Sequence, residues 1–148
     1  MSTAIGSEVF RIDQHTWTAL IDHAWSDFPY EVCGLLGTQP DGSIKHFPID
    51  NAERSMTYYV MEPRQLLRAM REIEDHEWDL AIYHSHTHTH PYPSQTDIRL
   101  AAYPDAVYLI VTLQDRDAPD IRGFRIVDGD VTEVEVRRVD ATDSNASA

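Results

Sequence analysis

The 148-residue sequence contains a single cysteine, Cys33, which excludes an internal disulfide and a cysteine-rich zinc motif. Basic residues are also few, because 12 Lys and Arg stand against 25 Asp and Glu and give a formal net charge of −13. This charge repels phosphate backbones and anionic lipid heads, so neither nucleic acid nor a membrane surface is an expected partner. Any metal ion must be held by histidine and carboxylate groups.

Long apolar runs are absent as well. The longest nearly apolar run, AVYLIVTL at residues 106–113, is far shorter than the roughly 20 residues that a membrane span needs. The opening MSTAIGSEVF has no basic region followed by an apolar stretch, as a secretory signal would have. We therefore expect a cytoplasmic protein.

The remaining composition is that of a globular domain, with 42% hydrophobic and 25% charged residues. We expect one domain over residues 1–139. The small, polar residues 140–148 predict a disordered C-terminal tail.

Apolar periodicity predicts an α/β protein. A first amphipathic helix, ended by Pro29, carries Trp17, Leu20, Ile21, Ala24, Trp25 and Phe28. A second begins near Pro63, with Leu66, Leu67, Met70 and Ile73 on its inner face, and a short third helix spans residues 94–102. Strands are predicted over residues 9–12, 31–36, 44–49, 58–61, 80–86, 106–113, 121–127 and 131–139. The turn sequences TQPDGS and DGD predict two hairpins.

Two histidines in this pattern indicate metal chemistry. His84 and His86 are one residue apart in a predicted strand, so their imidazoles project from the same face and can reach one ion. Asp97, on the short helix that follows, would add a third ligand and leave a fourth tetrahedral position for water. Three protein ligands and one open position are typical of catalytic zinc.

Each of these residues also has an explanation without a metal. The run HSHTHTH could be a solvated strand end, and His88 and His90 are expected on an exposed rim rather than in a second metal site. Ser94 and Asp97 have the spacing of a helix capping box, which could coexist with ligation by Asp97. A histidine-rich metal carrier would instead bind several ions.

Glu31 opens an apolar stretch, VCGLLG, where a charge is costly unless it meets water, a proton or a cation. We therefore place it at the edge of a cavity. Cys33 shares its strand face and could be mistaken for a nucleophile, but a free cysteine more often acts as a small buried apolar group.

The residues Glu31, His84, Ser85, His86, Ser94 and Asp97 together resemble the JAMM (MPN+) zinc peptidase motif, with seven residues between His86 and Ser94 and two between Ser94 and Asp97. All six positions match. The flanking sequences EVCGLLG, NAERS and YPSQTD resemble those of small bacterial members, and the resemblance extends over residues 9–139.

The resemblance implies an α/β fold of the MPN (JAMM) type: a curved mixed β-sheet flanked by helices, with cytidine-deaminase-like layering. It implies Zn²⁺ held by His84, His86 and Asp97, Glu31 as general base and acid, and Ser94 as a donor to the oxyanion. Ser85 would have a packing or supporting role. It also implies removal of a C-terminal amino acid, cysteine, from a small ubiquitin-like (β-grasp) sulfur-carrier protein after Gly-Gly, in cysteine biosynthesis.

Two further functions remain open at this point. One is a deubiquitinase-like isopeptidase or the processing of longer carrier extensions. The other is a noncatalytic MPN interaction module, which would require a damaged motif, whereas all six positions are intact here. The short predicted loops favour a thin tail over a folded conjugate as the substrate.

Overall fold

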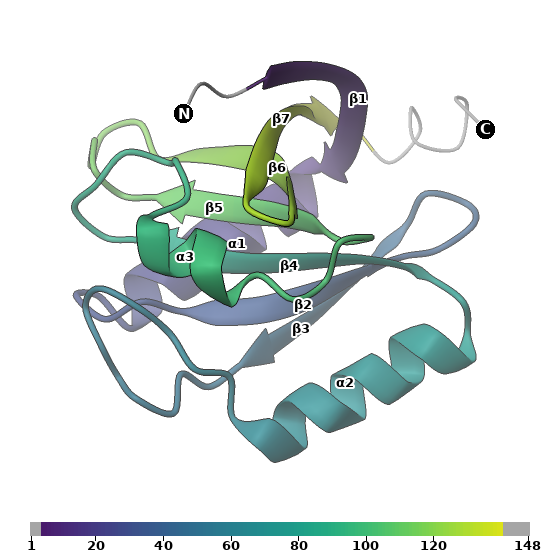
Figure 1. The fold of residues 1–148 in the computed structure, drawn as a ribbon, viewed down its shortest axis with the longest axis horizontal. Coiled ribbons are helices and arrows are strands. Elements are labelled where there is room, and N and C mark those ends of the chain that lie inside the picture. Colours follow the sequence, from purple (N-terminus) through teal and green to yellow (C-terminus); the bar gives the residue numbers. More distant parts are fainter. Residues whose placement is uncertain (1–3, 141–148) are drawn as a thin grey trace.

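The computed structural model of the chain describes residues 4–140, which build a seven-stranded mixed sheet and three helices (Figure 1). In chain order the elements are β1 (Ala4–Asp13), α1 (Gln14–Ser26), β2 (Cys33–Thr38), β3 (Ile44–Ile49), α2 (Pro63–Asp75), β4 (Asp79–His86), α3 (Gln95–Leu100), β5 (Val107–Thr112), β6 (Asp120–Val127) and β7 (Asp130–Val139). Across the sheet the order is β1-β7-β6-β5-β4-β2-β3. The pairs β1–β7 and β4–β5 are parallel, and the other neighbours are antiparallel.

The sheet separates two apolar cores, because side chains along a strand alternate between its faces. Trp17 and Leu20 of α1 pack into one core, whereas Ala69 and Ile73 of α2 pack into the other. In Figure 1, α1 lies behind the sheet and α3 lies in front of it. This arrangement is the curved α/β architecture that the resemblance implied.

Strand β4 fixes the orientation of the candidate site. It lies inside the sheet between β2 and β5, so both of its edges are hydrogen-bonded. Tyr83 faces the α1 core and Ile82 faces the α2 core. By alternation, His84 and His86 project on the same side as Ile82.

Several sequence predictions are confirmed. Both hairpins form, as β2–β3 and β6–β7. Pro63 begins α2, and the side chain of Glu62 caps that helix. The capping box of Ser94 and Asp97 begins α3.

Two predictions about elements are wrong. Residues 58–61 do not form a strand, since their one ladder contact is the isolated bridge between Asn51 and Met61. Leu67 does not belong to the inner face of α2, because it is 53% exposed while its neighbour Leu66 packs against the core. Adjacent helical positions differ by about 100°, so only one of the two leucines can face inward.

Two smaller points concern the C-terminal tail and membrane spans. The predicted tail over residues 140–148 lies, apart from Asp140, outside the residues that the structure describes. None of the helices within residues 4–140 has the length and apolar character needed to cross a membrane.

Candidate metal centre

The C-terminal end of β4 and the first turn of α3 bring the three predicted ligands together. His84 lies opposite Cys33 of β2 and Ile110 of β5, which fixes its backbone on both sides. Asp97 is fixed through the capping box, in which its Oδ2 accepts from the Ser94 N–H at 2.9 Å and its own N–H donates to the Ser94 hydroxyl at 3.0 Å. Helix capping therefore orients the carboxylate, as the sequence suggested.

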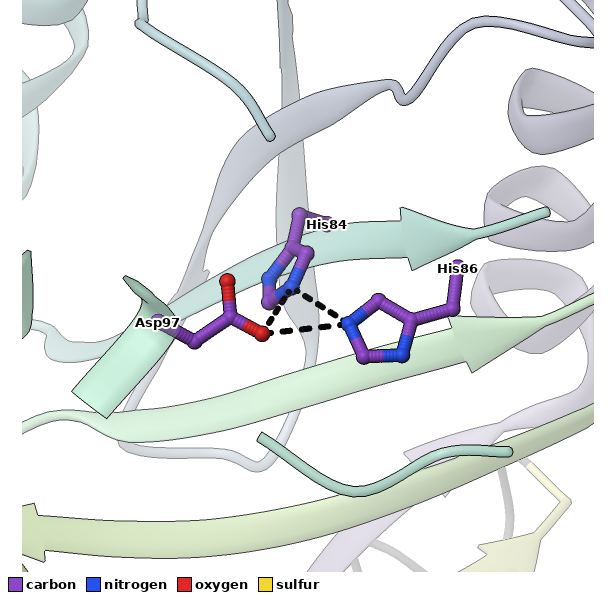
Figure 2. A group of neighbouring side chains, drawn as sticks. All are labelled: His84, His86 and Asp97. Carbon is purple, nitrogen blue, oxygen red and sulfur yellow. Dashed lines mark hydrogen bonds and ion pairs between the residues drawn. The ribbon is translucent and has the colours of Figure 1, made fainter. Parts of the chain in front are cut away.

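Figure 2 shows the resulting trio, in which the three ligand atoms point toward one another. The Nε2 atoms of His84 and His86 are 3.2 Å apart, and each lies 3.1 Å from Oδ2 of Asp97. The side chains are 2%, 6% and 7% exposed, respectively. Within residues 4–140, this is the only cluster of at least three His, Cys, Asp or Glu residues whose ligand atoms all lie within 4.8 Å of one another.

Hydrogen bonds alone do not account for this geometry. The Nδ1 atom of His86 lies 2.9 Å from the carbonyl oxygen of His90, so Nδ1 must carry a proton and donate it. In neutral His86, Nε2 then presents a lone pair to the carboxylate. If both Nε2 atoms were instead protonated to reach Asp97, two donors would face each other at 3.2 Å. A shared cation removes both conflicts.

The distances fit a tetrahedral ion. Zinc bonds of about 2.0–2.1 Å to nitrogen and oxygen place two ligand atoms of a tetrahedron about 3.3–3.4 Å apart. The three observed separations of 3.1–3.2 Å are close to that value. Two imidazoles and one carboxylate are also ligands that zinc accepts, so these residues fit the ion.

The electrostatics of Asp97 and His84 agree with this interpretation. Burial would raise the pKa of Asp97, but the adjacent imidazoles of His84 and His86 outweigh it and hold that pKa far below its usual range. Burial lowers the pKa of His84, which favours the neutral imidazole that a metal needs. Burial acts on His86 in the same direction, but Asp97 and the His90 carbonyl together raise its pKa.

Glu31 lies just before β2 and is only 3% exposed. Its Oε1 has no hydrogen-bond partner among the described residues. Burial raises the pKa of Glu31 to about 8, an effect that His86 opposes and Asp97 strengthens. Glu31 is thus a buried carboxyl group, close enough to feel the charges of the trio, with an oxygen free to bind a proton.

Ser85 and Cys33 have different surroundings. The Ser85 hydroxyl accepts from the Val32 N–H at 2.9 Å and so links β4 to the residue after Glu31. Burial raises the pKa of the Cys33 thiol to about 12, and its Sγ lies 3.4 Å from the carbonyl oxygen of Ile49. A thiol that stays protonated is a poor nucleophile, in agreement with a packing role.

His88 and His90 are exposed and lie outside the trio. The His88 ring is 5.5 Å from that of Phe28, and His90 contributes its carbonyl oxygen to His86. This agrees with the expected exposed rim.

Tyr59 is a part of the site that sequence reasoning missed. Its ring stacks on His84 with centroids 4.7 Å apart and an interplanar angle of 29°. Burial strongly raises the pKa of its hydroxyl. The sequence around Tyr59 is typical of a strand and gives no local signal that its ring stacks on the histidine.

An apolar groove of about 370 Å³ reaches the trio at Asp97. Four of its lining residues are large, apolar and exposed: Tyr58, Val60, Leu100 and Tyr103. Its remaining lining residues are Leu35, Tyr59, Met61, Leu66, Ile82, Thr96 and Tyr108. The groove is thus mostly apolar and adjoins the candidate metal centre through Asp97.

Known proteins of similar sequence include a family and named peptidases. A family model described as prokaryotic homologs of the JAB domain matches residues 13–127. Proteins named CysO-cysteine peptidase from Mycobacterium bovis and Mycobacterium tuberculosis are 45% identical over 126 residues, which cover 82% of this chain and 86% of theirs.

Solved structures share the fold. A protein from Desulfitobacterium hafniense superposes with a TM-score of 0.77 at 30% identity, over 89% of this chain and 93% of its own. A JAB1/MPN domain protein from Archaeoglobus fulgidus gives a TM-score of 0.50 at 18% identity, over 89% of this chain and all of its own (100%).

Proposed function

Because the chain belongs to the family of prokaryotic homologs of the JAB domain, we propose that it is a zinc peptidase that removes a C-terminal cysteine from a small sulfur-carrier protein. Family membership and 45% identity to CysO-cysteine peptidases make the chain a peptidase. The proposed carrier has a ubiquitin-like (β-grasp) fold and a Gly-Gly tail, and its hydrolysis releases cysteine for biosynthesis. The observation that carries the proposal is the unpaired Oε1 of Glu31 beside a trio whose geometry fits zinc.

His84 and His86 would hold the ion through Nε2, and Asp97 through Oδ2. Bound zinc would polarise the scissile carbonyl and lower the pKa of a coordinated water to about 7. The His90 carbonyl keeps the lone pair of His86 on Nε2, and the Tyr59 ring covers His84 and excludes bulk water from it.

Glu31 would move the proton. It accepts a proton from the attacking water, whose oxygen forms a bond to the carbonyl carbon of the last glycine. The carboxyl group then gives this proton to the amine nitrogen of cysteine as the C–N bond breaks. Glu31 ends the cycle as it began, and its pKa of about 8 makes both protonation states accessible near neutral pH.

Ser94 would stabilise the negative charge that develops on the carbonyl oxygen. Its hydroxyl oxygen accepts the Asp97 N–H as the cap of α3, which fixes the position of the group. The hydroxyl proton can then be donated to the developing oxyanion, which is the group that gains most from such a bond.

The groove supports a flexible tail as the substrate. Tyr58, Val60 and Leu100 line the groove together with Asp97 and offer apolar contact area beside the proposed ligands. Residues without side chains let the backbone approach the buried trio closely, so Gly-Gly immediately before the scissile bond suits this site.

The test is intact-mass spectrometry of a β-grasp carrier extended by one cysteine after Gly-Gly. We expect the zinc-loaded enzyme to shorten it by one residue, whereas chelated enzyme and Glu31→Gln leave it whole. Glu31→Gln should retain zinc, since Glu31 is not one of the proposed ligands. Cleavage of ubiquitin-like isopeptide conjugates with the cysteine-extended carrier left intact would overturn the proposal and favour an isopeptidase.

A further inference from the structure

Glu31 can serve as a base only if its carboxylate is both free and held in place. Its Oε1 makes no hydrogen bond, so the side chain is not held at that atom. Its backbone also lies outside the ladder of β2, which begins at Cys33. Ser85 holds the next residue, Val32, and the backbone of Glu31 itself is held by the bonds to its own N–H and C=O.

The segment NAERS, residues 51–55, provides both bonds. The Glu31 N–H donates to the carbonyl oxygen of Ser55 at 2.8 Å, and the Glu31 carbonyl oxygen accepts from Nδ2 of Asn51 at 3.0 Å. The segment bends back on itself at Arg54, which has a left-handed φ of 45° and donates its N–H to the Asn51 carbonyl oxygen. It thus clamps both backbone polar groups of Glu31.

Asn51 is the key member of this clamp, since it is 8% exposed and uses the full hydrogen-bonding capacity of its amide. Nδ2 donates to the carbonyl oxygens of Glu31 and Tyr58, at 3.0 and 3.2 Å. Oδ1 accepts from the N–H groups of Glu53 and Val60, at 3.2 and 3.0 Å. One side chain therefore connects Glu31 to the loop that carries Tyr58 and Val60 into the groove wall.

We propose that Asn51 is a positioning residue for Glu31, joining the wall of the substrate groove to the group that moves the proton. This inference rests on the proposed function, because it takes Glu31 as the base. Aspartate at this position would keep an oxygen acceptor for the Glu53 and Val60 amides but lose the Nδ2 donors to Glu31 and Tyr58. Alanine would lose all four bonds.

A matched control is Gln65, whose side chain bonds Asp50, the residue before Asn51. Gln65 accepts the Asp50 N–H at 2.8 Å and donates to the Asp50 carboxylate at 2.8 Å, so it anchors the same end of β3 through two bonds. Neither bond reaches Glu31. Gln65→Ala therefore loosens the same region without breaking the proposed connection.

The first measurement is steady-state cleavage of the cysteine-extended carrier by zinc-loaded enzyme. For Asn51→Ala and Asn51→Asp we expect kcat to fall about tenfold or more with KM changed by less than about threefold, because an interaction that serves the transition state has been lost. Gln65→Ala should keep both constants. A raised KM with unchanged kcat would show that Asn51 serves only the groove, and an equal loss of kcat in Gln65→Ala would show general loosening; either result overturns the inference.

The second measurement, amide hydrogen exchange followed by NMR, needs no activity. In Asn51→Asp the Glu31 amide should exchange faster while the Val60 amide keeps its protection, and in Gln65→Ala the Glu31 amide should exchange as in the wild type. Unchanged exchange at Glu31 in both Asn51 variants would contradict the positioning role. If the wild-type enzyme cleaved no carrier, the proposed function would fail, but exchange at Glu31 would still decide whether Asn51 holds it.

Discussion

Two carboxyl groups in the candidate site have opposite proton affinities, and their surroundings explain the difference. Both are taken out of water, which by itself raises a carboxyl pKa. Asp97 has two imidazole nitrogens 3.1 Å from its Oδ2, which outweigh its burial and keep it ionised, whereas Glu31 has no partner at Oε1 and its pKa rises to about 8. Separated pKa values of this kind allow one group to bind a cation while the other exchanges a proton.

Ser94 combines two roles that a substitution can separate. Ser94→Ala loses the hydroxyl that accepts the Asp97 N–H, and removal of such a cap costs about 1 kcal/mol of stability. The backbone N–H that holds Oδ2 of Asp97 remains, so zinc content should be kept. Loss of the oxyanion donor should lower the single-turnover rate about 10²- to 10³-fold.

Ser94→Thr is the matched control, because it keeps a hydroxyl at the cap and should retain zinc and most of the turnover. A wild-type single-turnover rate in Ser94→Ala would exclude the oxyanion role and leave Ser94 as a helix cap alone.

At the scale of elements, the parts of the site that depend on local spacing were predictable. Alternation along a strand places His84 and His86 on one face, and the Ser94–Asp97 spacing predicts the cap that begins α3. The loop over residues 51–61 was not predictable, because its amides are satisfied by a side chain, Asn51, rather than by a neighbouring strand. The aromatic pair Tyr58 and Tyr59 has high strand propensity, and this tertiary arrangement overrides it.

The interior of the sheet gives a prediction about packing. A Cβ atom on Gly34 of β2 would lie 2.5 Å from the ring and the hydroxyl of Tyr83 and 2.6 Å from the carbonyl oxygen of Phe47. Tyr83 cannot move easily, because its hydroxyl is bonded to His23 at 2.6 Å and to His46 at 2.7 Å. Gly34→Ala should therefore lower the free energy of unfolding by about 1–3 kcal/mol, measured by thermal or denaturant unfolding.

Gly129→Ala is a suitable comparison. Gly129 has a φ of 85° and open space around its Cβ position, so alanine there meets only the left-handed backbone cost of about 1–2 kcal/mol. Gly34→Ala as stable as the wild type would show that the strand can shift to accept the extra carbon.

At the scale of the whole molecule, a second histidine cluster lies on the α1 face of the sheet and bears on acid stability. Tyr83 has one hydroxyl proton for two imidazole neighbours, so its hydrogen bonds are complete when one ring donates to it and the other accepts. Burial, with His23 and His15 adding, lowers the pKa of His46 from 6.5 to about 4, and burial also lowers the pKa of His23.

The direction of the pH effect follows from these shifts. Between pH 6.5 and about 4 the unfolded chain binds a proton at His46 that the folded chain does not. The contribution of His46 to the free energy of unfolding is therefore fully present above pH 6.5 and is lost as the pH decreases through this range. We expect Tm to decline by several degrees more in the wild type than in His46→Gln, which can keep a hydrogen bond to Tyr83 without titrating. Parallel Tm profiles for the two proteins would rule out this contribution.

The fold class was within reach of the sequence because the six-residue motif implies it, and the same motif named three residues that the structure brings together, His84, His86 and Asp97. What stayed out of reach is contact between distant segments: the 60-residue separation of His23 and Tyr83, the stacking of Tyr59 on His84, and the link from Asn51 to Glu31. Each of these contacts depends on strand order and on loop packing, which periodicity does not encode.

The central claim is that His84, His86 and Asp97 form one catalytic metal site, and anomalous diffraction at the zinc edge from crystals of the zinc-loaded protein tests it most directly. We expect a single peak per chain about 2.0–2.1 Å from Nε2 of both histidines and Oδ2 of Asp97. A peak at His88 or His90, or a zinc ion bound without Asp97, would contradict it.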